Sequence, residues 1–366
     1  MPRRCLTALA CALLLAACAA PDHLERRDGY VVDHSHVAPS HNSRVRHLVI
    51  HYTDVDEAES LAVLTGPHVS AHYVLPLPAR EHDGAPLVFQ LVDESRRAWH
   101  AGASAWKNRT HLNDTSIGIE IVNLGPDRPF AEVEALLDAD PHAPLEIAWA
   151  PYPDAQIEAL IALARDLIAR HAIHPTDVVA HSDIAPTRKI DPGPAFPWRR
   201  LHEAGIGVWP EEATVDRYRA RFEAAPPTLA TLQAALAAWG YPLTASGELD
   251  TQTRAVLRAF QMRFRPADYR GRPDAETAAL LWALLEGYRP SALSRGGIRP
   301  RRRPRGRDAE EWAWDSGSPE AWGKVASRHC RGRRRWAESP EVYHSPLEPK
   351  AAISHDQESP PWTRSD

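Results

Sequence analysis

The segment from His181 to Asp191 constrains this chain most, because it brings together a histidine, a lysine and a carboxylate. Residues 177–180 (Asp-Val-Val-Ala), just before it, are mostly apolar and β-branched and predict a short buried strand. Pro186 and the Pro-Gly-Pro run at 192–194 oppose regular structure afterwards. His181 is therefore predicted at a strand end, with Asp191 on a loop that folds back.

His181 and Asp191 together predict two ligands of a catalytic zinc site. Catalytic zinc usually has three protein ligands drawn from histidine and carboxylate, with a fourth position left open. His51 is a good candidate for the missing ligand, because residues 45–52 have the apolar, β-branched centre of a core strand. Period two places Val49 and His51 on one face of that strand, so His51 at its end can point into a cleft.

A third strand, predicted at 116–123, carries Glu120 on the face opposite three isoleucines. A carboxylate within so apolar a strand is costly unless it has a partner, so Glu120 is either paired or functional. Further strands are predicted at 69–76 and 87–92, joined through a turn at Asp83-Gly84.

A long amphipathic helix is predicted from Asp154, read as its N-cap, to about His171. A shorter helix is predicted near residues 130–137. Strands mixed with packed helices indicate an α/β domain, which we place at residues 43–210.

A smaller unit, assigned to residues 228–288 after a linker at 211–227, is predicted to be a three-helix bundle. One helix is expected around 229–236, ending before Gly240. Two others follow an internal repeat, in which Asp250 and Asp274 are each read as the N-cap of a helix with an apolar stripe. Because the bundle carries no catalytic cluster, we expect it to raise the local substrate concentration only.

The N-terminus predicts export. Arg3 and Arg4 precede an apolar run too short to span a bilayer, which is typical of a signal peptide at residues 1–17. Leu-Ala-Ala-Cys18 resembles the bacterial lipobox, with an ordinary secretory signal as the alternative, and Ala19 resembles the outer-membrane sorting signal. We therefore expect an outer-membrane lipoprotein facing the periplasm, anchored in the membrane through a lipid on Cys18 and tethered by residues 18–42.

Composition limits the remaining choices. A net charge of -5 argues against nucleic-acid binding. Residues 289–366 contain arginine runs among Ser, Pro and Glu without a period and predict a disordered tail. The chain is expected to be a monomer.

Residues 45–210 resemble the zinc-dependent N-acetylmuramoyl-L-alanine amidases of the amidase_2 family, which is related to the peptidoglycan recognition proteins. Five pieces carry the resemblance in the family's order: Val49–Thr53, Ser70–Tyr73, Ala98–Gly102, Ser116–Asn123 and His181–Pro194. Residues 229–285 similarly resemble the peptidoglycan-binding type 1 module. The resemblance implies an α/β domain with a mixed central sheet flanked by helices, plus a small all-α peptidoglycan-binding domain.

The resemblance implies an enzyme that hydrolyses the amide between N-acetylmuramic acid and L-alanine in peptidoglycan, for cell-wall turnover or recycling. The sequence leaves open whether the sugar is ordinary muramic acid, its 1,6-anhydro form or both. Peptidoglycan and muropeptides are the expected partners and Zn²⁺ the cofactor. The implied metal ligands are His51, His181 and Asp191. Glu120 would move the proton and Lys189 would stabilise the oxyanion, which fits the chemistry of these side chains.

Substrate contacts are expected from four further residues: His72, Trp99, His100 and Asn123. Simple packing is the alternative for Trp99 and His100, and His72 is expected to orient or pack near the site rather than bind the metal.

Two other functions fit the sequence less well. A non-catalytic peptidoglycan-recognition protein would typically lack a metal ligand, whereas the full set is present here. A zinc endopeptidase would be expected to carry a His-Glu-x-x-His helix, which this sequence lacks.

Overall fold

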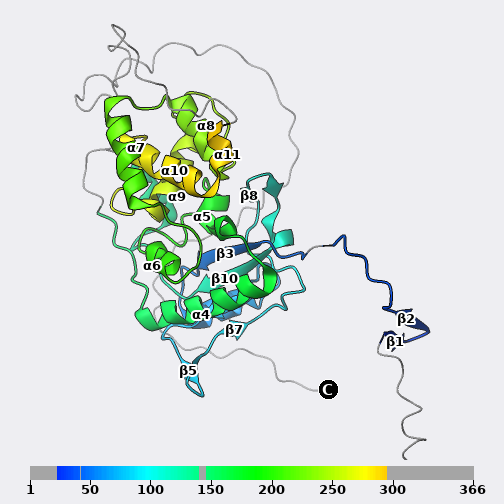
Figure 1. Cartoon of the computed structure of the whole chain (residues 1–366). Helices are drawn as coiled ribbons and strands as arrows, with labels where there is room; N and C mark the ends of the chain where they lie inside the picture. The colour runs from blue at the N-terminus through cyan, green and yellow to red at the C-terminus, as the bar shows by residue number, and fades with distance from the viewer. Residues whose placement is uncertain (1–22, 42, 140–145, 295–366) are drawn as a thin grey trace, which may run out of the picture. The chain divides into compact units, whose positions relative to one another are not determined.

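A five-stranded sheet forms the centre of the first domain in the computed structural model, which describes residues 23–41, 43–139 and 146–294 (Figure 1). The strand order is β11 (Val178–Ala180), β3 (His47–Tyr52), β10 (Ser116–Ile121), β4 (Tyr73–Leu75) and β7 (Phe89–Gln90). The first four run parallel, and β7 is antiparallel to β4. The mixed sheet expected for the family is confirmed.

One face of this sheet is apolar and packs against α4 (Asp154–His171). In β3, Leu48 and Ile50 point to this face, and the isoleucines of β10 join them. Fully buried side chains of α4 complete the layer: Ile157, Leu160, Ala164 and Leu167. The predicted helix is confirmed, but Pro153 occupies the N-cap position and Asp154 is the first helical residue.

The remaining elements of the first domain are short. They are α2 (Glu57–Leu64), β5 (Glu81–His82), β6 (Ala85–Pro86), β8 (Ala105–Trp106), β9 (Arg109–Thr110), η2 (Leu112–Thr115), α3 (Phe130–Ala139), η3 (Pro175–Asp177), α5 (His181–Ile184) and α6 (Trp198–Glu203). The sequence predicted no helix at α5. A single turn fits there because Pro186 lies beyond its end, and because the Asp183 carboxylate accepts a hydrogen bond from the backbone N–H of Ala180.

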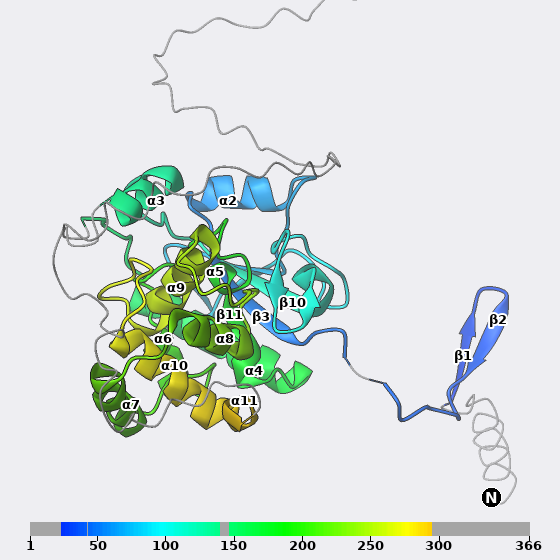
Figure 2. The same ribbon diagram turned by 90° about the horizontal axis from the view of Figure 1, so that it is seen from above.

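The second domain contains the three predicted helices, α8 (Leu229–Trp239), α9 (Thr251–Phe264) and α10 (Ala275–Tyr288). Asp250 and Asp274 cap α9 and α10 as expected. Residues 211–227, predicted to be a linker, contain the helix α7 (Glu212–Ala224). Figures 1 and 2 show this helix, which packs on α10. This helix is mostly polar and buries only Val215, Tyr218 and Phe222, so its apolar stripe was too sparse to recognise.

Two regions at the ends of the described chain differ from the sequence prediction. A hairpin of β1 (Leu24–Arg27) and β2 (Tyr30–Asp33) lies within the expected irregular tether. A short α11 (Pro290–Ser294) opens the expected tail. Residues 1–22, with Cys18, and residues 295–366 lie outside the described residues. Among the helices described, none has the length and apolar character needed to cross a membrane.

Candidate metal centre and active site

Two histidines and one carboxylate converge at the carboxyl end of β3. His51 is near the end of β3, His181 follows β11, and Asp191 lies on the loop after α5. All three are buried, and one potential ligand atom from each lies within 4.8 Å of the other two. Because β3 and β11 are adjacent parallel strands, their carboxyl ends bring the two histidines together.

The three facing atoms are spaced as metal ligands would be. The Nδ1 atoms of His51 and His181 are 2.9 Å apart, and they lie 3.2 Å and 3.0 Å from Asp191 Oδ2. A tetrahedral zinc site with bonds of about 2.0–2.1 Å has edges of about 3.3–3.4 Å between ligand atoms. The observed separations are slightly shorter, so the group could hold a small divalent cation after minor adjustment.

The outer nitrogens of both histidines have partners that leave Nδ1 free for a metal. His51 Nε2 is 3.0 Å from His100 Nδ1, and His181 Nε2 is 3.3 Å from the backbone oxygen of Ala101. If each Nε2 carries the proton, it donates to that partner and the Nδ1 lone pair faces the site.

The contact from His51 continues through a buried chain of hydrogen bonds. His100 Nε2 lies 3.1 Å from Ser116 Oγ, and Ser116 Oγ donates to the backbone oxygen of Leu112 at 2.6 Å. Each group donates in one direction, from His51 through His100 and Ser116 to Leu112. This series of hydrogen bonds thus fixes both the ring orientation and the tautomer of His51.

Gly118 makes room for this arrangement. A Cβ atom at this position of β10 would lie 2.4 Å from Cγ of His100. A glycine inside an apolar strand often marks a close approach of another group. That signal was available in the sequence, but the roles of His100, Ser116 and Gly118 around His51 were not recognised from it.

Glu120 also faces this site. In the register of β10 and β3 it is paired with His51, and its Oε1 is 3.9 Å from His51 Nδ1. Burial, reinforced by the charge of Asp191, raises the pKa of Glu120 well above its usual value. Within the described residues, Glu120 Oε2 is buried without a hydrogen-bond partner, so it is free to exchange a proton with a bound molecule.

The protonation states of two ligand candidates suit metal binding. Burial, together with the nearby His181, lowers the pKa of His51 to about 4, which favours the neutral ring. Burial raises the pKa of Asp191, but the charges and hydrogen bonds of His181 and His51 outweigh it and hold that pKa well below normal. A neutral imidazole and an ionised carboxylate are the forms that bind metals.

Lys189 is exposed, and it lies on the loop between α5 and Asp191. Its positive charge partly offsets the rise in the pKa of Glu120, which places it within electrostatic range of that carboxylate. Its predicted role toward an oxyanion stays a prediction.

The four residues expected to contact substrate occupy different environments. Trp99 is 51% exposed, whereas His72, His100 and Asn123 are buried. His72 Nδ1 accepts from the Gly118 N–H, and its Nε2 faces the Arg96 oxygen. The side chain of Asn123 bonds to backbone groups of Pro151 and Gly125. Trp99 alone of these four offers a large exposed surface, and the substrate contacts stay predictions.

Comparison with protein families gives two matches in the order of the two domains. Residues 41–194 match the model described as N-acetylmuramoyl-L-alanine amidase. Residues 226–281 match the putative peptidoglycan binding domain.

A curated relative aligns over nearly its whole length. The chain is 46% identical over 287 residues to N-acetylmuramoyl-L-alanine amidase AmiD of Escherichia coli (strain K12), covering 78% of this chain and 99% of the relative. Together with the peptidoglycan-binding match, this relative indicates a periplasmic location at the cell wall.

Solved structures show the same likeness. One is AmiD from E. coli in complex with the substrate anhydro-N-acetylmuramic acid-L-Ala-D-gamma-Glu-L-Lys, at 44% identity and a TM-score of 0.65, covering 73% of this chain and 99% of that one. Another is AmpDh3 from Pseudomonas aeruginosa, at 43% identity and a TM-score of 0.60, covering 72% and 98%.

These matches extend across both domains. The three converging residues lie within residues 41–194, which match the amidase family. The chain therefore belongs to the amidase_2 family and is an N-acetylmuramoyl-L-alanine amidase with a peptidoglycan-binding domain.

Proposed function

We propose that the chain is a zinc-dependent amidase that cleaves the bond between N-acetylmuramic acid, including its 1,6-anhydro form, and L-alanine. The observation that carries this proposal is the convergence of His51, His181 and Asp191, with Glu120 beside them. The anhydro form is included because the E. coli relative was solved with an anhydromuropeptide substrate.

The side chains present fit zinc. Two imidazole nitrogens and one carboxylate oxygen are a ligand set typical of catalytic zinc, and both imidazoles have an outer partner that fixes their orientation. A bound zinc ion would supply Lewis acidity and would lower the pKa of water towards neutrality.

Glu120 is proposed to move the proton. Its raised pKa makes it a better base than an exposed glutamate, and its Oε2 has no partner among the described residues. It would accept a proton from the attacking water and later deliver that proton to the leaving nitrogen of L-alanine. The strand β10 holds it in place, so little reorganisation is needed.

Lys189 is proposed to stabilise the negative charge that develops on the carbonyl oxygen. An exposed lysine on the loop before Asp191 can reach a substrate that enters the site.

The proposal is tested by mass spectrometry of the products from purified anhydromuropeptides and from intact sacculi, with metal analysis of the purified enzyme. We expect a free L-alanine amino terminus in the products, and about one zinc per chain from a single three-ligand site. Products cut elsewhere in the stem peptide, or full activity after complete chelation, would contradict the proposal.

We also propose that the mature protein is a monomeric lipoprotein on the periplasmic face of the outer membrane, anchored through Cys18. The support is the lipobox-like Leu-Ala-Ala-Cys18 sequence followed by Ala19. Changing Cys18 to Ala should release the protein from the membrane fraction, and unaltered sedimentation with membranes would count against the anchor.

A further inference from the structure

The peptidoglycan-binding domain contacts the segment that carries His181. Arg263 of α9 lies in the second domain, yet its Nη1 donates to Asp183 Oδ2 at 2.7 Å. Tyr241, which follows α8, donates its hydroxyl to Asp183 Oδ1 at 2.6 Å. Both oxygens of Asp183 therefore have a partner from the second domain.

Asp183 is also the residue that shapes the turn at His181. Its Oδ2 accepts a hydrogen bond from the backbone N–H of Ala180 at 2.9 Å, across the junction of β11 and α5. His181 is the first residue of that turn. Any movement of the Asp183 carboxylate would thus be passed to the backbone that positions His181.

The ion pair is buried, and Arg263 has further partners in the first domain. Asp183 is 0% and Arg263 4% exposed. The guanidinium of Arg263 also donates through Nη2 to the backbone oxygen of Val178 in β11, and it lies 4.0 Å from the ring centroid of Trp198 in α6. A buried charge with this many partners fixes one geometry, and removal of one partner leaves an uncompensated charge.

The same helix supports the segment that carries Asp191. Met262, next to Arg263, belongs to a buried cluster with Ile190, the residue before Asp191. Tyr269, in the loop after α9, belongs to that cluster and receives a hydrogen bond from Trp149 Nε1 at 2.8 Å. Of two adjacent residues of α9, Arg263 thus bonds to the segment that supplies His181, and Met262 shares a buried cluster with the residue before Asp191.

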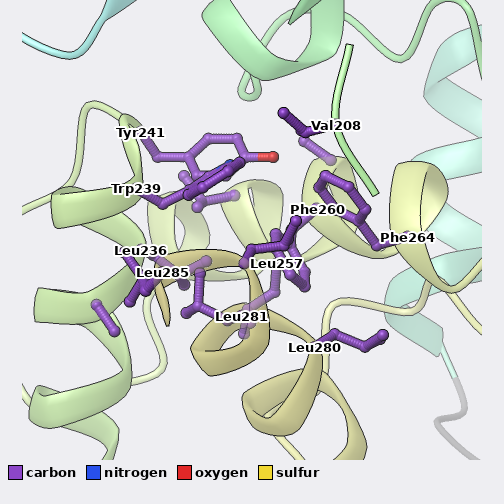
Figure 3. Close-up of a cluster of buried hydrophobic side chains, with 14 of the residues drawn as sticks. Val208, Leu236, Trp239, Tyr241, Leu257, Phe260, Phe264, Leu280, Leu281 and Leu285 are labelled. Carbon is purple, nitrogen blue, oxygen red and sulfur yellow. The ribbon is translucent and has the colours of Figure 1, made fainter. Parts of the chain in front are cut away.

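The hydrophobic core is continuous across this contact. One cluster contains Val179 and Ile184 of the first domain together with Phe260 and Tyr241 of the second. Figure 3 shows Tyr241, Phe260 and Phe264 within it, and Figure 2 shows α5 beside α9. A domain that acted only as a tethered binding module would not need such a contact.

We propose that Arg263 and Tyr241 are positioning residues for the amidase reaction, acting through Asp183 on His181. The peptidoglycan-binding domain then helps to position a ligand of the metal centre, in addition to any role in binding the cell wall. This differs from the expectation from sequence that the domain only raises the local substrate concentration. The inference rests on the proposed zinc function.

The test uses the full chain with Arg263→Met, Arg263→Lys and Tyr241→Phe. Zn²⁺ affinity is measured by competition with a chelator, and kcat and KM are measured on a soluble anhydromuropeptide. We expect Arg263→Met to lower Zn²⁺ affinity, kcat or both by about 10-fold, the lower end of the cost of losing a direct outer partner of a metal ligand, because Arg263 acts through Asp183. KM should change little, because Arg263 is buried away from solvent. Arg263→Lys should recover part of the loss.

Arg265→Met is the matched control. Arg265 is the C-cap residue of the same helix, but its ion pairs are with Asp268, Asp274 and Glu276 inside the second domain. This variant should lose stability without losing Zn²⁺ affinity or kcat. Equal losses in Arg263→Met and Arg265→Met would reduce the role of Arg263 to general stability and overturn the proposal.

If Arg263→Met does not fold, Tyr241→Phe tests the positioning role instead. This variant removes a single hydroxyl and keeps the ring in the core. We expect a smaller but measurable loss in Zn²⁺ affinity or kcat. A folded Tyr241→Phe enzyme with both values unchanged on the soluble substrate would overturn the proposal. Zn²⁺ affinity separates this outcome from failure of the proposed substrate, since it is measured without turnover.

Discussion

The two faces of the central sheet are built in different ways. The face against α4 is closed by apolar side chains such as Ile119 and Leu160, joined by Trp198 of α6. The opposite face carries His51, Gly118 and Glu120, and part of it is supported by the second domain. The first face depends on local periodicity and burial, whereas the second depends on polar contacts between segments far apart in the sequence.

Substitutions on the two faces should therefore affect different properties of the enzyme. The apolar face should tolerate modest changes with a loss of folding free energy alone. On the polar face, buried side chains such as His51 and His100 have specific partners, so a small change there should alter metal binding or the reaction even when the fold survives.

The largest effect is expected from Asp191→Ala on the polar face. It removes one of the three converging ligands, so zinc and amidase activity should both be lost. Metal analysis and turnover of soluble muropeptide measure the two effects. Asp154→Ala, an exposed carboxylate at the start of α4, is the control and should keep both. Retention of zinc at wild-type affinity by the Asp191 variant would remove Asp191 from the ligand set.

Leu160→Ala on the apolar face should instead cost about 2–5 kcal/mol of unfolding free energy, as is typical for a buried leucine. Leu160 is fully buried between α4 and the sheet. Urea denaturation measures this loss, and the zinc content of the folded fraction should stay that of the wild type. A folded variant depleted of zinc would show that the two faces are not independent.

Ser116→Ala should have an intermediate effect, because it removes the acceptor for His100 in the chain that orients His51. We expect zinc affinity to fall by about 10-fold or more. Ser60→Ala is the matched control, since Ser60 is also buried and donates to a backbone oxygen, that of Asp56, far from the site. Similar zinc affinities in the two variants would argue against the chain of hydrogen bonds.

The smallest effect concerns Glu94, which binds Arg170 and His171 of α4. The hydrogen bonds from Arg170 are the main cause that lowers the pKa of Glu94 to about 2. Between about pH 4.5 and pH 2 the unfolded chain therefore binds more protons, and stability falls as the pH falls. Glu94→Gln should flatten this dependence and cost about 1 kcal/mol at neutral pH, given that Arg170 is partly exposed. Denaturation at several pH values checks it, and an unchanged acid slope would refute it.

The sequence predicted the elements whose pattern is local. Strands β3, β10 and β11 were recognised from apolar, β-branched runs, and α4, α8, α9 and α10 from helical periodicity with capping residues. It did not predict α7, whose apolar stripe is sparse, or the hairpin of β1 and β2, whose residues are mostly exposed.

The same distinction applies to the site. The convergence of His51, His181 and Asp191 was anticipated from strand ends and family motifs, and the structure brings the three together. The partners of these residues were not anticipated. His100 contacts His51 from 49 residues away, and Arg263 contacts Asp183 from 80 residues away. Such pairings depend on how distant segments and domains pack, which a single sequence does not display.

The most direct test of the account is to separate holding the metal from moving the proton. Glu120→Ala should retain near-stoichiometric zinc by metal analysis, because Glu120 is outside the converging group of His51, His181 and Asp191. Its kcat on a soluble muropeptide should fall by about a hundredfold or more, the size of a general-base contribution. Loss of zinc in Glu120→Ala, or a kcat near that of the wild type, would contradict the roles assigned here.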